Sequence, residues 1–393
     1  MKRYVDKPAG WSGVELAVRR GAFRLLQVMY GTSRSFIERY VRPPRFVPPT
    51  LRQKKFEVSQ SVSACFGVDT SRFRLYYSGS IGFCAAIYKQ ETFMGVPLVE
   101  KCKKYFAELT EASRAAAKID EENVYQEANP LTRKIMDELL SEIMLPGSGI
   151  VNIENFKAFY RAITEEGKSG LILMEHYTNL DLPAICYLLD HAGEEWARDL
   201  SKRIVAVAGM KLNEESPIVR AWAEGFTRVV IYPTRSLDKV AANAQSETEI
   251  EEEKKRARKI NLAAMHAMDD CKKRGQAILV FPSGTRYRPG KPETKRGLRE
   301  IDSYLRLFDV MLLVSINGNC LRINPEAPDN MMMDLIENDK ITLSASPVID
   351  CKQFRRDVLA SLPETEEDAK QKIVDRVMAI LEEQHEAAEA GRK

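Results

Sequence analysis

The sequence predicts an α/β fold in which a largely parallel sheet is covered by helices. From residue 150 onward, short apolar runs typical of buried strands alternate with segments of helical hydrophobic period. This alternation favours parallel strands joined by helical crossovers. Before residue 125 the pattern is mostly helical and contains no cluster of reactive side chains. We therefore predict an N-terminal helical accessory domain over residues 1–125 and an α/β domain over residues 126–393.

The N-terminal region begins with a basic segment. Residues 1–46 contain ten Lys and Arg residues and three acids, whereas the whole chain has a net charge of +3. Apolar residues recur at helical spacing between Val14 and Met29, which predicts a basic amphipathic helix. Such a helix can lie on an anionic membrane surface, or it can be a bundle helix with a solvated basic face. Prolines at 43–44 and 48–49 mark a connector, and the further candidate helices are residues 59–64, 81–88 and 96–119.

The α/β domain begins with a helix that Asn129-Pro130 opens and Gly147-Ser-Gly149 ends. Five apolar runs are the predicted strands: residues 170–174, 204–208, 229–232, 277–281 and 310–316. The predicted helices are residues 156–165, 182–189, 218–224, 248–274 and 365–390. The acidic and basic residues that begin the helix 248–274 lie three to four apart, which is typical of a solvated helix face.

Composition indicates a soluble globular protein. Of 393 residues, 44% are hydrophobic and 29% are charged, and no apolar run approaches the ~18 residues that a membrane span needs. The start, Met-Lys-Arg-Tyr, lacks the apolar core of a signal peptide. Seven scattered cysteines without a Cys-x-x-Cys pair favour small buried side chains in a reducing cytoplasm over metal or disulfide use. We expect a cytoplasmic protein with no metal, no organic cofactor and no nucleic-acid partner.

Two motifs carry the candidate chemistry. His176 and Asp181 follow the strand 170–174 and precede a helix, so that a turn can bring the two side chains into contact. An imidazole with a carboxylate on its other nitrogen is the arrangement of a general base. The second motif, Phe281-Pro-Ser-Gly-Thr-Arg-Tyr-Arg288, follows the strand 277–281. Each motif alone has an ordinary explanation, a chance spacing or a solvated turn. Their shared position at strand ends, where α/β sheets bind ligands, favours a site.

The second motif and a third strand end predict an anion site. Arg286 and Arg288 can hold a phosphate by charge-assisted bonds, and Arg235 follows the strand 229–232. Gly284 permits a close backbone approach, so the amides of Gly284 and Thr285 can add to anion binding. No phosphate-binding loop of the Gly-x-x-x-x-Gly-Lys-Ser/Thr or Gly-x-Gly-x-x-Gly type follows a strand, which argues against a nucleotide-phosphate enzyme.

These motifs resemble those of the glycerolipid acyltransferases, and most closely those of the soluble plant-plastid type of glycerol-3-phosphate acyltransferase. Its His-x-Thr-x-x-Asp box is matched by His176, Thr178 and Asp181, and its Ser-Gly-Gly-Arg-Asp-Arg-Pro box by Ser283-Gly-Thr-Arg-Tyr-Arg-Pro289. Two further segments match. Tyr232-Pro-Thr-Arg-Ser236 puts Arg235 at the family's phosphate-binding lysine, and Ala208-Gly-Met-Lys211 matches an Ala-Gly-Asp-Arg segment.

The resemblance covers about residues 130 to 320 and has three departures. Glu175 stands where the family commonly has Asn, and Ser236 replaces a histidine. Ser283 stands where the membrane-bound branch has Glu, which favours the soluble branch. The base and the arginines are retained, so the departures bear on the acceptor more than on the class of reaction.

The resemblance implies a glycerol-3-phosphate 1-O-acyltransferase of phospholipid biosynthesis, with an acyl carrier protein or coenzyme A thioester as donor. His176 would be the general base, with Asp181 as its partner. The implied phosphate ligands are Arg235, Arg286 and Arg288, and the implied supporting residues are Thr178, Lys211, Ser283, Gly284 and Thr285. The box has no nucleophilic Ser or Cys, which favours direct transfer over an acyl-enzyme.

Two alternatives stay open at this stage. The acceptor can be lysophosphatidate, in which case its pocket must also hold an acyl chain. From a different class, the chain can be a non-catalytic module that binds lipid or acyl carrier protein, although a retained histidine argues against it. Because the product would be a lipid, we also expect transient contact with an anionic membrane surface on the inner face of the membrane.

Overall fold

The computed structural model describes residues 95–393, except 215, 245, 329 and 393, and residues 95–393 form one compact unit. The basic segment 14–29 and most of the predicted accessory domain lie outside the described residues. Within them, helix α5 (Lys103–Ala112) packs against α6 (Pro130–Ile143) and α11 (Pro217–Glu224). Residues 103–112 are therefore packed on the α/β unit.

A mixed nine-stranded sheet forms the centre, so the predicted α/β class is confirmed. Its order is β2-β6-β5-β7-β4-β8-β11-β3, with β12 also paired to β8. The five strands from β6 to β8 are mutually parallel, and they are the five that the sequence predicts: β4 (Gly170–Met174), β5 (Ile204–Gly209), β6 (Arg228–Ile231), β7 (Ala277–Val280) and β8 (Val310–Asn317). The short outer strands are β2 (Tyr125–Gln126), β3 (Gly149–Val151), β11 (Thr342–Ala345) and β12 (Ile349–Asp350).

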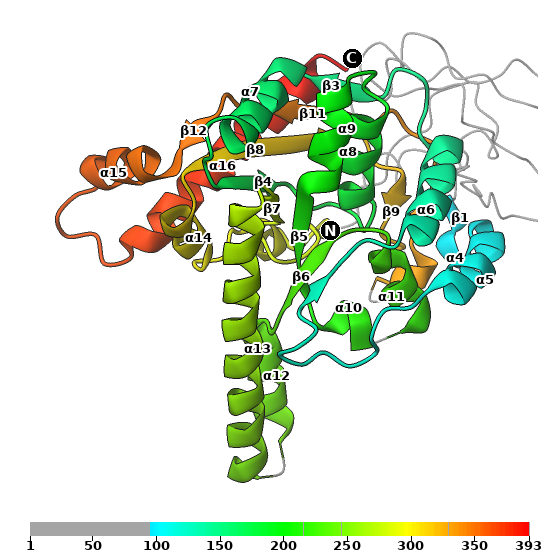
Figure 1. Cartoon of the computed structure of the whole chain (residues 1–393), viewed down its shortest axis with the longest axis horizontal. Coiled ribbons are helices and arrows are strands. Elements are labelled where there is room, and N and C mark those ends of the chain that lie inside the picture. Colours follow the sequence, from blue (N-terminus) through cyan, green and yellow to red (C-terminus); the bar gives the residue numbers. More distant parts are fainter. Residues whose placement is uncertain (1–94, 215, 245, 329, 393) are drawn as a thin grey trace, which may run out of the picture. The chain divides into compact units, whose positions relative to one another are not determined.

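The central strands are apolar on both faces because helices cover both. Alternate side chains of β4 enter two different cores: Ile172 and Met174 enter one, Leu171 and Leu173 the other. With α5, α6 and α11, the first core contains side chains of α7 (Ile153–Thr164), α8 (Asp181–Asp190) and α9 (Glu195–Arg203). The second contains those of α13 (Glu247–Lys273), α14 (Ile301–Leu307), α15 (Cys351–Ser361) and α16 (Ala369–Ala390). Figure 1 labels these helices and the central strands of the sheet.

Several predicted features of the chain are present. Asn129 caps α6 by accepting a hydrogen bond from the amide of Leu131, with Pro130 at the first helical position. The long helix and the last helix lie within one to four residues of their predicted bounds. The five cysteines in the described part of the chain are all free and buried. Among the helices of residues 95–393, none combines the length and apolar character that crossing a membrane requires.

A second, three-stranded antiparallel sheet lies outside the main one. It joins β1 (Val96–Pro97), β10 (Leu335–Ile336) and β9 (Leu321–Arg322). The amide of Leu98, where the short helix α4 (Leu98–Lys101) begins, donates to the carbonyl of Asp334 at 2.7 Å. Asp334 directly follows the 3-10 turn η3 (Met331–Met333), so this small sheet fixes the position of a buried carboxylate.

Candidate active site

Asp181 is the most constrained polar side chain of the first motif. It lies in the first turn of α8 and is 1% exposed. Its Oδ2 accepts from His176 Nδ1 at 2.9 Å, from the Tyr177 amide at 2.6 Å and from the Thr178 amide at 2.8 Å, and its Oδ1 accepts from Thr178 Oγ1 at 2.9 Å. His176 and Asp181, five residues apart, are thus in contact, because the turn between them folds its backbone amides onto the Asp181 carboxylate. Thr178, a residue matched only through the resemblance, donates two hydrogen bonds to Asp181.

These contacts assign the tautomer of His176. A carboxylate oxygen can only accept, so the proton on the near side belongs to Nδ1, and Nε2 is left as an acceptor. The ring stacks on Phe281, with centroids 3.9 Å apart and planes 15° from parallel. Its side chain is 16% exposed. A neutral imidazole with a fixed ring and a basic nitrogen left as acceptor can take a proton from a bound alcohol.

The two motifs meet because β7 lies beside β4. Leu173 and Val280 are register partners, so the chain leaves both strands at the same level. The Tyr287 amide donates to the His176 carbonyl at 2.7 Å. Gly284 has φ +62°, and a Cβ there would clash with Leu298 Cδ1, which explains why this position is glycine. The second motif therefore supports the ring and the backbone of His176.

The remaining turn residues have structural partners. The buried Ser283 donates its hydroxyl to the Thr285 carbonyl at 2.7 Å, which tightens the turn. The backbone amide of Leu298 donates to the carbonyl of Pro282 at 2.8 Å. Thr285 is half-buried and Gly284 is exposed, so solvent reaches this part of the turn. These contacts make Ser283 a residue that shapes the turn.

Arg286 forms a buried ion pair with Asp334, a partner that sequence reasoning missed. Burial raises the pKa of the Asp334 carboxyl, and the positive charges of Arg286 and Arg288 oppose this effect. Asp334 Oδ1 has no hydrogen-bond partner among the described residues. Arg288 is half-buried, and its amide donates to Thr294 Oγ1 at 2.9 Å. The two arginines thus act on one buried carboxylate, which no local sequence signal could have linked to them.

Arg235 and Lys211 lie at the same edge of the sheet but farther along it. Both are exposed, Arg235 in the first turn of α12 (Thr234–Asn243) and Lys211 at the start of α10 (Lys211–Glu214). They follow β6 and β5, as His176 follows β4. Neighbouring strands lie about 4.8 Å apart, so β6 is about 10 Å from β7. Arg235, Lys211 and His176 therefore all lie at the carboxyl ends of the parallel strands. Among the described residues, no contact joins Arg235 to Arg286.

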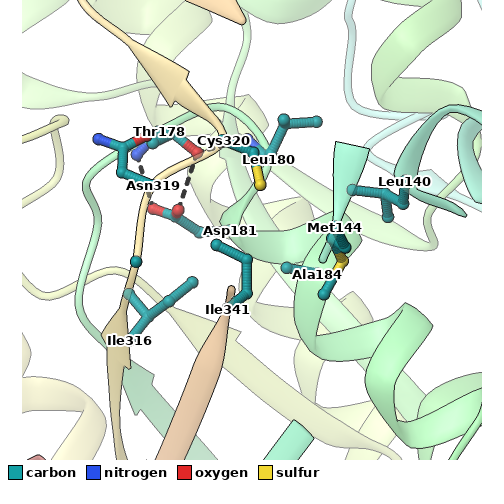
Figure 2. Close-up of a pocket in the computed structure, with 11 residues that line it drawn as sticks. Leu140, Met144, Thr178, Leu180, Asp181, Ala184, Ile316, Asn319, Cys320 and Ile341 are labelled. Atoms are coloured by element: carbon teal, nitrogen blue, oxygen red, sulfur yellow. Dashed lines mark hydrogen bonds between the residues drawn. The ribbon is translucent and has the colours of Figure 1, made fainter. Parts of the chain in front are cut away.

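A small cavity lies beside the buried side chains of Asp181 and Thr178. Figure 2 shows the Asp181 carboxylate with its bonds to Thr178, and the side chains of Leu140 and Met144 across the cavity. Ile316, Cys320 and Ile341 complete most of its lining. Its volume is about 10 Å³, room for about one water molecule and far below the roughly 300–1,000 Å³ of ordinary ligand sites. The lining is mostly apolar, and its polar side chains are those of Thr178, Asp181 and Asn319.

In the part of the chain that the structure describes, no group of three His, Cys, Asp or Glu side chains is arranged to hold a metal ion. No known protein-family model matches this chain, and no curated protein is significantly similar to it. What the site can do therefore rests on its geometry and on the motif resemblance alone.

Proposed function

We propose that this protein is an O-acyltransferase that moves an acyl chain from a thioester to the sn-1 hydroxyl of glycerol-3-phosphate. The observation that carries the proposal is the His176–Asp181 contact. It leaves Nε2 as the acceptor nitrogen, while Phe281 fixes the ring. A purely structural histidine would not require this combination. The motif order supports the acyltransferase class.

The proposed reaction needs a base and no covalent enzyme intermediate. The acceptor hydroxyl gives its proton to His176 Nε2 as its oxygen attacks the thioester carbonyl carbon and forms a C–O bond. The tetrahedral intermediate then collapses and the C–S bond breaks. The departing thiolate accepts the proton from the imidazolium, which leaves His176 neutral again. Asp181 stabilises the imidazolium in between, because its carboxylate contacts Nδ1 at 2.9 Å.

The acceptor phosphate is assigned to the arginines of the second motif and to Arg235. Arg286 and Arg288 lie directly after the turn that contacts His176, so a phosphate held there would bring the adjacent hydroxyl toward Nε2. Arg286 already shares its charge with Asp334, which holds the guanidinium in place. The exposed Arg235 and Lys211 would add positive charge from the neighbouring strand ends.

Between the two acceptors, the motif resemblance favours glycerol-3-phosphate, because the matched boxes are those of the soluble plant-plastid type of glycerol-3-phosphate acyltransferase. An assay with both thioesters, of acyl carrier protein and of coenzyme A, identifies the donor. The non-catalytic module is disfavoured because four hydrogen bonds orient Asp181 toward the histidine ring and its turn.

The test is acyl transfer by purified full-length protein with radiolabelled glycerol-3-phosphate or lysophosphatidate and with both thioesters. We expect transfer to glycerol-3-phosphate and at least a ~100-fold loss of kcat in His176→Ala. His191→Ala is the matched control, because His191 is exposed at the far end of α8. Equal turnover by the two variants, or activity only with lysophosphatidate, would contradict the proposal in its mechanism or in its acceptor.

We also propose that the product leaves at a membrane surface, with the basic segment 14–29 as the contact. Surface charges are screened over about 8 Å at physiological ionic strength, so binding should weaken with salt. Flotation with anionic vesicles compares the full chain with a variant in which Arg19, Arg20 and Arg24 are Glu. Equal recovery of both proteins, or recovery that is insensitive to salt, would remove this segment from the proposal.

A further inference from the structure

The residues on each side of His176 are anchored to the C-terminal helix. Glu175 is buried, and its Oε2 lies 2.9 Å from His385 Nδ1. Its Oε1 accepts from the Tyr177 hydroxyl at 3.2 Å, and that hydroxyl lies 3.5 Å from the same His385 nitrogen. The rings of Tyr177 and His385 are 5.3 Å apart. One histidine therefore contacts both sequence neighbours of the candidate base.

This anchor comes from the layer opposite to Asp181. His385 belongs to α16, whose buried side chains fill the second core, whereas Asp181 begins α8, in the first. His385 is itself held, because Asn317 of β8 donates to its carbonyl at 3.0 Å and to Glu389 at 3.0 Å. Asn317 thus joins the end of β8 to two successive turns of the last helix. The loop that carries His176 is fixed from both faces of the sheet.

Glu175 requires such a partner. A buried carboxylate is costly unless it is hydrogen-bonded or paired. Besides His385 and Tyr177, the amide of Ile316 donates to Glu175 Oε2 at 3.1 Å. Glu175 also stands where the resembled family commonly has Asn, and His385 lies 210 residues away, beyond the region of resemblance. The fold brings the buried Glu175 and the histidine of the last helix together, so that each is a hydrogen-bond partner of the other.

We propose that His385 is a positioning residue for His176, acting through Glu175 and Tyr177 to fix the backbone on both sides of the base. The inference rests on the proposed function, because it assigns the C-terminal helix a part in the same reaction. In this role His385 takes no part in the proton transfer itself. Its effect is on where Nε2 lies relative to the acceptor hydroxyl, and small displacements there are costly to turnover.

The experiment compares His385→Leu, which removes the donor, with His385→Gln, which restores one. We expect His385→Leu to lower kcat about 10- to 100-fold, with KM for both substrates within about twofold and with substantial rescue by Gln. Glu175→Gln and Tyr177→Phe keep side-chain size and report on the other two members. Adding His385→Leu to Glu175→Gln should cost less than the sum of the single effects, because the residues act together. His266→Asn, at an exposed position of α13, is the control.

A second readout does not depend on activity. The chain has four histidines, so the imidazole resonances of His176 can be followed by NMR in each variant. We expect them to shift in His385→Leu and Glu175→Gln and to stay unchanged in His266→Asn. Unchanged His176 resonances and kcat, with only a lower melting temperature, would overturn the positioning role. A wild-type protein without acyl-transfer activity would refute the proposed function, while the resonances would still decide whether His385 positions His176. If His385→Leu does not fold, Glu175→Gln and Tyr177→Phe decide the question by the same criteria.

Discussion

The Asp181→Asn substitution tests the proposed role of the carboxylate most directly. The side chain keeps its shape, and one amide oxygen can still accept from the Tyr177 and Thr178 amides and from His176 Nδ1. What is lost is the negative charge beside the imidazolium that forms during transfer. Two unit charges about 4 Å apart interact by about 4 kcal/mol at an effective dielectric constant of about 20. At about 1.4 kcal/mol for each factor of ten, kcat should fall about 1,000-fold.

The assay measures kcat and KM for both substrates, together with urea unfolding. We expect the free energy of unfolding to fall by about 1–3 kcal/mol, since charge-assisted hydrogen bonds become neutral ones. Asp199→Asn is the matched control, because Asp199 of α9 is a partly buried carboxylate that accepts hydrogen bonds from Tyr160 of α7 and Arg203 of α9. A loss of kcat below about tenfold in a folded Asp181→Asn protein would refute the electrostatic argument, because about 1.4 kcal/mol would then be its upper limit.

Three further predictions follow from the site and its support. Arg235→Ala should raise KM for the acceptor and leave stability unchanged, because Arg235 is exposed. Arg286→Ala should likewise raise KM for the acceptor. It should in addition lower the free energy of unfolding by about 3–5 kcal/mol, because Asp334 is left buried and unpaired. An equal KM effect on the thioester would remove Arg235 from the phosphate site, and a fully stable Arg286→Ala would show that the ion pair is dispensable. Gly284→Ala should destabilise the protein by about 2–4 kcal/mol, because of the left-handed backbone and the clash with Leu298. Adding Leu298→Ala should recover part of the lost stability in urea unfolding. No recovery would mean that the strain lies in the backbone alone. Stability should also fall as pH rises through the raised pKa of His385. Burial opposes the charge on His385, but the hydrogen bond and charge of Glu175 outweigh it and raise this pKa above 6.5. This contribution is complete below about 6.5 and is lost as pH passes the raised value, with Tyr177, Lys295 and Glu389 as the other groups around the ring. Melting temperatures of wild type and His385→Gln between pH 6 and 9 check this, and parallel curves would contradict it.

The sequence alone was sufficient for the α/β class, for the five central strands and for the His176–Asp181 pair. All three depend on local information. A strand buried on both faces must be apolar throughout, and a strand-to-helix turn brings side chains five residues apart within reach. The short outer strands were not predicted, because strands of two to four residues, such as Tyr125–Gln126 and Thr342–Ala345, have no measurable period. They form where the edges of the sheet find a partner.

Tertiary structure decided the order of the strands and, with it, the environment of each candidate residue. Placing β7 beside β4 is what stacks Phe281 on His176, and a pairing between residues about a hundred positions apart leaves no periodic signal. Asp334 and His385 are 48 and 210 residues from their partners Arg286 and Glu175. An ion pair needs only two complementary charges within about 4 Å, and many residues of this chain could meet that condition. The fold selects the pairs by bringing their backbones together.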